Sequence, residues 1–178
     1  MVVFDTTVLL LFLDPDAKPP LDPTTGAPVA RCKDRIDHFI SILEKRKEKI
    51  VIPTPVLSEV LVRAGDAGPE YLDILSKAAC FRVAPFDKRG AVELATTTRE
   101  AIDAGDKKGG SESTWVKVKF DRQIVAIAKV QGATTIFSDD GNPAGFARKA
   151  GLTVIPIHDL PLSSESAQQS LPLNNPSE

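Results

Sequence analysis

Residues 119–142 read KFDRQIVAIAKVQGATTIFSDDGN, and this stretch decides the fold. Asp121 precedes an apolar run that stops at a glycine, which predicts a helix with a carboxylate at its start. The β-rich residues 133–137 follow and lead into Asp139 and Asp140, which predicts a strand with two carboxylates at its end. Such a helix start and strand end face the same edge of an α/β sheet, and open α/β sheets place their chemistry at that edge.

Each of these carboxylates also has an ordinary structural interpretation. Asp121 suits the cap position of its helix, because Asp favours that position. Asp139, Asp140 and Gly141 suit a tight turn, because these residue types supply turn geometry. A function is indicated only if carboxylates from other parts of the chain fall at the same edge of the sheet.

The composition is that of one globular domain. The chain has 178 residues, of which 42% are hydrophobic and 26% are charged, enough for a single domain with a core. Its formal net charge of −2 and its pI of about 5.8 argue against nonspecific nucleic-acid binding by the whole surface. They leave room for a local basic strip beside an acidic pocket.

The location that we expect is the cytoplasm. No apolar run approaches the roughly 20 residues of a membrane span, so no membrane association is expected. The first residues, MVVFDTTVLLLFLDPD, have no basic flank, carry Asp5 inside the apolar run and lack a small-residue cleavage site, so we expect a buried strand and helix there, not a signal peptide. Cys32 and Cys80 do not suggest a disulfide scaffold, which favours a reducing compartment.

Strands and helices alternate along the chain. Short β-rich runs predict strands at 2–4, 50–52, 81–84, 133–137 and 152–157. Apolar periodicity and start signals predict helices at 8–13, from 31, from 54 with Thr54 as its cap, at 71–79, at 87–104, from 121 and at 143–150. This alternation predicts an α/β sandwich with a central, mostly parallel sheet flanked by helices.

Three segments stand apart from this pattern. Residues 14–30 hold five prolines and read as a surface insertion. Residues 105–114 are polar and glycine-rich and are expected to be a flexible loop. The expected domain spans 1–160, and the polar tail 161–178 is expected to be disordered.

Five carboxylates are expected at one edge of the parallel sheet. Asp5 ends the first strand and Glu59 lies one turn into the helix after the second strand, while Asp121, Asp139 and Asp140 come from the stretch quoted above. Carboxylates crowded in a pocket repel one another and need protons or a cation. Oxygen ligands favour Mg²⁺ or Mn²⁺, and such an ion suits metal-dependent hydrolysis of a phosphodiester.

Four motifs in this order resemble those of the PIN-domain family, nucleases that include the VapC-type toxins of toxin–antitoxin pairs. They are VVFDTTVLL at 2–10, IVIPTPVLSEVL at 50–61, KFDRQIVAIA at 119–128 and TTIFSDDGNPAGFARKAGLTVI at 134–155. The resemblance covers nearly all of residues 1–160. It implies a parallel sheet flanked by helices, an acidic pocket that binds Mg²⁺ or Mn²⁺, and cleavage of RNA. It also implies an antitoxin partner and a homodimer as possibilities to be tested.

The resemblance also implies roles for individual residues. The family's acidic positions fall on Asp5, Glu59, Asp121 and the pair Asp139 and Asp140. The spacing of the last motif, a hydroxyl residue two before the acid, selects Asp140 after Ser138 and leaves Asp139 to assist.

Thr7 and Ser138 match hydroxyl positions that support the pocket. Independently of the family, we expect Lys119 and Arg122, beside Asp121, to help hold a substrate phosphate; the alternative is a solvated pair at the start of a helix.

Other classes of protein fit the sequence less well. A phosphatase of the haloacid-dehalogenase type would carry a second Asp where this chain has Thr7, and a receiver domain would have its acidic pair near the N-terminus. His38 and His158 have no metal-ligand spacing, which argues against zinc. A PIN-like module that binds RNA or protein without cutting remains the alternative, although such modules usually lack one of the acids.

Overall fold

A computed structural model describes residues 1–163 of the chain. Most of the tail for which we expect disorder, residues 164–178, lies outside the described residues. None of the helices within residues 1–163 is long and apolar enough to cross a membrane.

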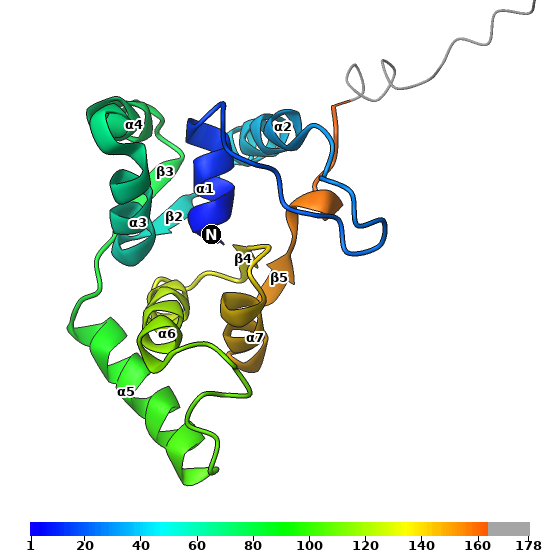
Figure 1. The fold of residues 1–178 in the computed structure, drawn as a ribbon. Helices are drawn as coiled ribbons and strands as arrows, with labels where there is room; N and C mark the ends of the chain where they lie inside the picture. The colour runs from blue at the N-terminus through cyan, green and yellow to red at the C-terminus, as the bar shows by residue number, and fades with distance from the viewer. Residues whose placement is uncertain (164–178) are drawn as a thin grey trace, which may run out of the picture.

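Five parallel strands form the central sheet (Figure 1). The strands are β1 (Val2–Phe4), β2 (Ile50–Pro53), β3 (Phe81–Ala84), β4 (Thr135–Phe137) and β5 (Thr153–Ile155). Their order is β3-β2-β1-β4-β5, and every neighbouring pair is parallel. The prediction of an α/β fold with a mostly parallel sheet is therefore confirmed.

Helices connect the strands. They are α1 (Thr6–Leu13), α2 (Cys32–Lys45), α3 (Thr54–Ala64), α4 (Gly68–Lys77), α5 (Lys88–Asp103), α6 (Trp115–Val130) and α7 (Gly141–Lys149), with short 3₁₀ turns at Gly65–Ala67 and Ile157–Asp159. Polar side chains cap the N-termini of several of these helices: Asp5 caps α1, Asp87 caps α5, Thr114 caps α6 and Asp140 caps α7. Two of these capping carboxylates, Asp5 and Asp140, are also residues of the candidate site.

The core lies on both faces of the sheet, because successive side chains of a strand point to opposite sides. Val3 and Ile136 pack on the side that α3, α6 and α7 cover, and Val2, Phe4 and Phe137 pack on the side that α2 covers. Helix α1 contributes to both clusters, as expected of a helix that is apolar all round. Helix α5 lies on the outer side of α6, away from the sheet (Figure 1).

The strand order reverses next to β1. The chain runs from β1 to β2 and β3 on one side and returns to β4 and β5 on the other, and β1 pairs with both β2 and β4. Parallel α/β sheets form a crevice outside the carboxyl ends of the strands at such a reversal. Asp5 directly follows β1, and Ser138, Asp139 and Asp140 follow β4, which places them at this crevice.

The capping residue of two helices differs from the prediction. Helix α6 begins at Trp115 and not at Asp121, because the Thr114 hydroxyl accepts the backbone N–H of Lys117 and caps it there. Asp121 therefore lies in the second turn of α6 and caps nothing. Helix α3 begins at Thr54 itself, whose hydroxyl accepts the N–H of Phe86 and does not serve as the cap.

The two atypical segments within the domain are irregular. Residues 14–30 contain a single antiparallel bridge, between Leu21 and Pro28. In the 105–114 segment, the Gly109 carbonyl accepts a hydrogen bond from Lys149. The hydroxyls of Ser111 and Ser113 bond the side chain of Asn142 in α7. The segment thus lies against α7, while its flexibility stays a prediction.

Candidate active site

A polar cavity of about 180 Å³ lies at the carboxyl ends of β1 and β4. Residues from both strand ends and from α1, α3, α6 and α7 line it: Asp5, Thr6, Thr7, Glu59, Arg63, Lys117, Asp121, Ile124, Asp140 and Pro143. Four of the five carboxylates that the sequence analysis selects therefore come together in one cavity. They come from four separate parts of the chain. Helix capping and turn formation are local, so they do not require acids from such distant segments to meet.

Asp5 is held rigidly at the start of α1. Its side chain is only 3% exposed, and Oδ1 accepts the backbone N–H of Val8 at 2.9 Å. Burial raises the pKa of Asp5 to about 7, and the charges of Asp139 and Asp140 act in the same direction, although hydrogen bonding from Ser138 and Val8 opposes the rise. Near neutral pH, Asp5 is thus a carboxyl poised between its protonated and ionised forms.

Asp121 is fully buried, with an exposed fraction of 0%. Its Oδ1 accepts a hydrogen bond from the Lys117 ammonium at 2.7 Å, whereas its Oδ2 has no hydrogen-bond partner within residues 1–163. Burial raises the pKa of Asp121 to about 6; Lys117 counteracts this rise, and the charges of Asp140 and Glu59 add to it. Asp140 and Glu59 thus lie close enough for their charges to raise the pKa of Asp121.

Asp140 has two structural roles. Its Oδ1 accepts the N–H of Asn142 at 3.0 Å and caps α7, while its Oδ2 accepts a hydrogen bond from Lys117 at 3.0 Å. Its own N–H donates to the buried hydroxyl of Ser138 at 3.2 Å. Ser138 therefore shapes the turn that presents Asp140, while it does not itself line the cavity.

Glu59 reaches the cavity from α3. The hydroxyl of Thr6 donates to its Oε2 at 2.8 Å, and the guanidinium of Arg63, one turn further along α3, donates to its Oε1 at 2.8 Å. Both carboxylate oxygens thus have a partner, and Glu59 is held in a fixed position beside the other three acids.

Three predicted residues lie elsewhere. The carboxylate of Asp139 accepts the N–H of Ile157, at 3.2 and 3.3 Å from its two oxygens, beyond β5. Lys119 and Arg122 line other cavities, because residues one or two positions from Asp121 point to different sides of α6. The predicted Thr7 does line the acidic cavity.

Lys117, Arg63 and Thr6 are the functional candidates that sequence reasoning missed. Lys117 and Asp121 are four residues apart on one helix, as are Glu59 and Arg63, and this spacing is a recognisable signal of an ion pair. Thr6 has no such signal, because its contact with Glu59 joins residues that are 53 positions apart.

The donor atoms of the cavity are of the kind that a hard divalent cation prefers, but the described residues do not assemble them into a metal site. Carboxylate oxygens are the ligands that Mg²⁺ and Mn²⁺ prefer, and the buried Oδ2 of Asp121 has no partner within residues 1–163, which a cation would supply. In the observed arrangement Lys117 provides the positive charge. No group of three or more His, Cys, Asp or Glu side chains in the described part of the chain is arranged to hold a metal ion.

Lys117 is charged in this position. Burial alone would lower the pKa of its ammonium group, but the hydrogen bonds to Asp121 and Asp140 and the charges of these two carboxylates outweigh burial, and the pKa is raised. The lysine is therefore a cation that bridges two of the four acids.

No protein-family model and no curated protein sequence matches the chain, but its fold is similar to that of solved toxin structures. A chain of the VapBC2 complex from Rickettsia felis, bound to a DNA fragment from its promoter, matches with a TM-score of 0.59 and 15% identity over 88% of this chain and 98% of that chain. For DNA-bound VapBC from Salmonella typhimurium, the TM-score is 0.53 and the identity 14%, over 88% and 97% of the two chains.

A third structure is VapC20 of Mycobacterium tuberculosis, a toxin that cleaves the sarcin-ricin loop. Its TM-score is 0.52 and its identity 13%, over 86% of this chain and 97% of that chain. These similarities extend over nearly the whole of each toxin chain, and at such identities they establish the fold. The chain thus has the PIN-domain fold of the VapC toxins, which confirms the resemblance that its four sequence motifs indicate.

Proposed function

We propose that this protein is a metal-dependent endoribonuclease whose active site is the acidic cavity at the ends of β1 and β4. One observation supports the proposal above all others: Asp5, Glu59, Asp121 and Asp140 come from four distant segments and line the same cavity of about 180 Å³. Gathering four carboxylates costs stability, since like charges repel. Such a cost is characteristic of functional sites, where strongly perturbed acids cluster.

The residues divide into two groups by their contacts. Asp121 and Asp140, with Asp5 beside them, would hold a Mg²⁺ or Mn²⁺ ion once Lys117 moves away, because Oδ2 of Asp121 has no partner within residues 1–163 and the departure of Lys117 would free Oδ2 of Asp140. Both oxygens of Glu59 are bonded to Thr6 and Arg63. A divalent cation held there supplies charge stabilisation at the phosphodiester and lowers the pKa of water.

Glu59 is suited to accept a proton from an attacking water, since its carboxylate is fixed at the wall of the cavity. Its two hydrogen-bond partners, Thr6 and Arg63, hold the carboxylate in place. Lys117 is suited to contact a phosphate oxygen when it leaves the acids. Its side chain is 41% exposed, long and flexible.

The test compares cleavage of a mixed RNA substrate by the wild type and by Asp121→Asn in the presence of Mn²⁺. We expect the variant to lose activity by several orders of magnitude, as for the loss of a positioned charge in an active site, while its circular dichroism spectrum is unchanged. Asp139→Asn is the matched control, because Asp139 is in the same loop as Asp140 but bonds Ile157 outside the cavity.

The outcomes separate the hypotheses. Equal cleavage by the wild type and Asp121→Asn would contradict the proposed active site and point to a contaminating nuclease. RNA binding without cleavage by any form, with or without Mn²⁺, would favour the alternative of a non-catalytic module that binds RNA or protein.

The proposal extends to partners. The similarity to VapBC complexes supports a toxin that acts on RNA in the cytoplasm and is neutralised by an antitoxin, and we also propose a homodimer. The product of a small open reading frame directly upstream should co-purify with this chain and suppress cleavage. Light scattering of the purified chain should give twice the 19.1 kDa mass of one copy.

A further inference from the structure

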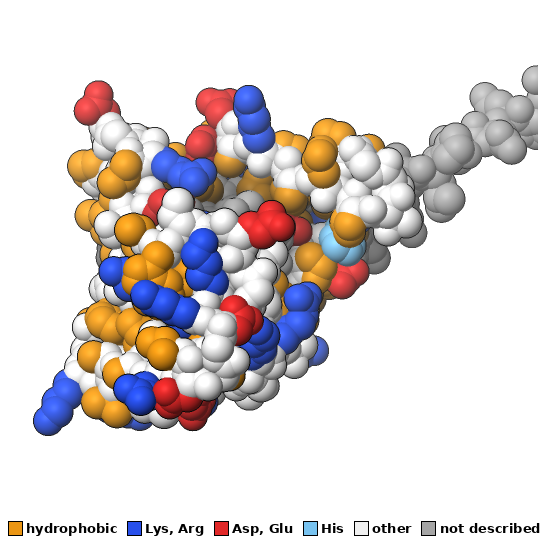
Figure 2. Space-filling view, turned by 60° about the horizontal axis from the view of Figure 1, so that its bottom comes forward, with side chains coloured by type: hydrophobic (Ala, Val, Ile, Leu, Met, Phe, Trp, Pro, Cys, Tyr) orange, Lys and Arg blue, Asp and Glu red, His pale blue; other side chains and the backbone are white. Residues whose placement is uncertain are grey.

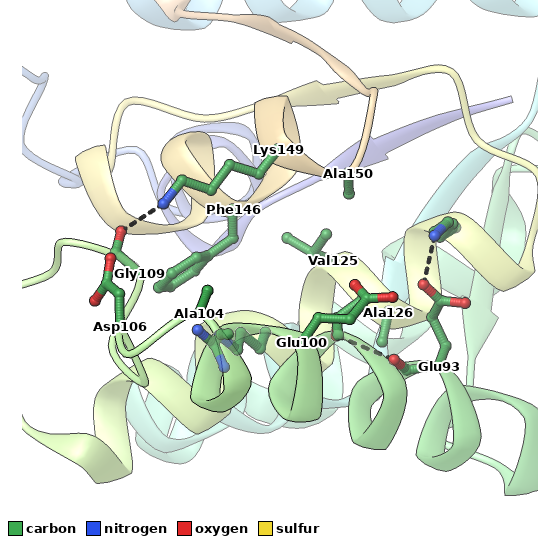
Figure 3. A pocket seen from close by; sticks show the side chains of 14 residues that line it. Glu93, Glu100, Ala104, Asp106, Gly109, Val125, Ala126, Phe146, Lys149 and Ala150 are labelled. Atoms are coloured by element: carbon green, nitrogen blue, oxygen red, sulfur yellow. Dashed lines mark hydrogen bonds and ion pairs between the residues drawn. The ribbon is translucent and has the colours of Figure 1, made fainter.

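A second cavity, of about 290 Å³, lies between α5, α6 and α7, and it is separate from the acidic one. Figure 3 shows Phe146 and Val125 on one side of it and Ala104 and Glu100, from the α5 side, on the other. None of the four acidic-cavity carboxylates lines it. Much of its wall is apolar and comes from Ala101, Ala104, Val125, Ala126, Phe146 and Ala150.

A buried arginine without a carboxylate partner opens into this cavity. Arg122 is 7% exposed, and its one hydrogen bond within residues 1–163 is to the hydroxyl of Thr98 at 3.3 Å. No carboxylate of the described residues forms an ion pair with it. A guanidinium has five N–H donors, so most of its donors have no partner among the described residues.

Aromatic rings hold the guanidinium in place without neutralising it. The Arg122 guanidinium carbon lies 5.0 Å from the centre of the Phe146 ring and 5.9 Å from that of Trp115. Contacts of this kind stabilise a cation modestly, whereas burying a charge without an ion-pair partner is costly. Burial lowers the pKa of Arg122, and the charge of Asp106 opposes this effect without forming an ion pair with the arginine. The site therefore favours an occupant that brings a negative group to Arg122.

A second cation converges on the same end of the cavity. Lys149 donates to the carbonyl of Gly109 at 2.9 Å, as Figure 3 shows. The position that a side-chain Cβ would take at Gly109 lies 2.8 Å from Phe146 Cε1, 3.4 Å from Arg122 Nη2 and 3.5 Å from Lys149 Nζ, so only a glycine fits where the ring and both positive groups approach the backbone. Arg122 and Lys149 thus approach the same stretch of backbone, and an anionic group in the cavity that both line would be close to both positive groups.

The charged side chains that line the cavity disfavour the binding of a polyanion. Acidic and basic side chains line the cavity in equal number among the described residues: Glu93, Glu100 and Asp106 against Arg122, Lys129 and Lys149. Glu93 is paired with Lys129 at 2.6 Å, but Glu100 and Asp106 would repel an extended phosphate backbone. Figure 2 shows the same mixture of acidic, basic and hydrophobic side chains over the face formed by α5, α6 and α7.

We propose that this cavity binds a small organic acid with one anionic group and a flat apolar body, such as an aromatic carboxylate. The anionic group pairs with Arg122 and Lys149 beside Gly109, and the apolar body lies against Val125, Ala126 and Phe146. Apolar walls with a few converging polar groups are typical of small-molecule sites, and the size of the cavity suits a compact ligand.

The first test uses two probes of nearly equal shape, 2-naphthoate and its neutral amide 2-naphthamide, titrated calorimetrically into the full chain. We expect saturable one-to-one binding of the acid and at least about tenfold weaker binding of the amide, the factor that corresponds to 1.4 kcal/mol. Equal affinities for the two probes, or no saturable binding of the acid at millimolar concentrations, would overturn the proposal.

The second test changes the protein. Arg122→Met removes the charge and should weaken binding of the acid about tenfold while affinity for the amide is unchanged. Lys107→Met is the matched control: Lys107 is exposed and stacks on Trp115 but does not line the cavity, so its variant should bind as the wild type does. Naphthoate affinity unaltered by Arg122→Met would contradict the proposal.

A third variant covers the case in which Arg122→Met does not fold. Ala101→Leu adds bulk from the partly exposed side of α5 that lines the cavity, and it should abolish binding of both probes. Retained binding in this variant would place the ligand elsewhere. Displacement of 2-naphthoate by a short RNA would likewise overturn the proposal, since it would assign the cavity to the nucleic acid.

Discussion

The ammonium group of Lys117 lies 2.7 Å from Oδ1 of Asp121, one turn further along α6, and this contact joins a half-buried lysine to a fully buried acid. The same nitrogen lies 3.0 Å from Oδ2 of Asp140 at the start of α7. The lysine thus stands between two carboxylates that a divalent cation would share. A cation entering the cavity must displace it, because two positive groups at one place repel.

Removing Lys117 should therefore strengthen metal binding. In Lys117→Met, Mn²⁺ should raise the melting temperature at concentrations about tenfold lower than in the wild type, since a ligand that binds only the folded state stabilises it in proportion to its affinity. Without metal, the variant should be less stable, because Asp121 and Asp140 lose their counter-charge. Electron paramagnetic resonance of free Mn²⁺ measures the affinity directly.

Lys119→Met provides the control for this measurement, because Lys119 is two residues away on the same helix and does not line the acidic cavity. Its Mn²⁺ dependence should equal that of the wild type. Identical Mn²⁺ affinities of the wild type and Lys117→Met would refute the proposed competition between Lys117 and the metal ion.

The pKa of Asp5 predicts how stability depends on pH in the presence of a chelator. The carboxyl ionises near its ordinary value of 3.8 in the unfolded chain and near 7 in the folded protein. Between these values the unfolded chain binds fewer protons than the folded one, so the contribution of Asp5 to the free energy of unfolding falls as the pH rises from about 4 to about 7. That contribution is greatest below pH 4, where both states are protonated.

Asp5→Asn should remove this dependence while it keeps the cap of α1, since Asn caps as well as Asp does. We expect the variant without metal to be more stable than the wild type at pH 8 by on the order of 4 kcal/mol, and the difference should vanish toward pH 4. Urea unfolding at several pH values measures it. Asp87→Asn at the exposed cap of α5 should show no such trend, and a pH-independent gap for Asp5→Asn would contradict the assignment.

The core makes a separate prediction about the sheet. Ile136 lies in β4 between β1 and β5 and is 0% exposed, so Ile136→Ala should lower the free energy of unfolding by about 3 kcal/mol, through lost burial and the cavity left behind. Val92 on α5 is 60% exposed, and Val92→Ala should change stability by less than about 0.5 kcal/mol. Urea unfolding measures both free energies. If the slope of the free energy of unfolding against urea concentration is the same as in the wild type, the difference arises in the folded state.

The location of Asp5 and Asp140 could be predicted from the sequence, because each directly follows a short apolar run. The apolar run of a buried parallel strand is short, so the end of the strand is well defined. The residue that follows its last apolar position lies at the carboxyl edge of the sheet. Local sequence and topology thus predict the same position for these two acids. The position of Glu59 could be predicted because its helix begins immediately after β2.

The start of α6 could not be predicted in this way. Residues 115–120, WVKVKF, alternate between apolar and charged side chains, a pattern more typical of a strand than of a first helical turn. The structure makes them helical because Thr114 caps the helix and Val118 is buried in the core. Asp121 was therefore expected at a helix start although it lies in the second turn.

The place of Arg122 depends on rotation about the helix axis. Neighbouring residues of a helix differ in direction by about 100°, so Arg122 faces α5 and α7 while Asp121 faces α3 and the strand ends. Proximity in sequence to Asp121 was a poor guide to proximity in space. The contact of Lys117 with Asp140 was equally hidden, because it depends on how α6 packs against α7, which no local pattern specifies.

Thr6 and Thr7 give a final test, because the family resemblance selects Thr7 and the structure shows Thr6 bonded to Glu59. The Thr6 hydroxyl donates to Glu59 Oε2 at 2.8 Å, so Thr6→Val leaves that oxygen without its donor and the carboxylate less firmly held. We expect RNA cleavage by Thr6→Val to fall about tenfold, the effect of roughly 1.4 kcal/mol, with little change in the melting temperature. Thr7→Val serves as the matched control and should cleave nearly as well as the wild type. A larger loss for Thr7→Val than for Thr6→Val would show that Thr7 supports the reaction and that the bond from Thr6 to Glu59 is dispensable.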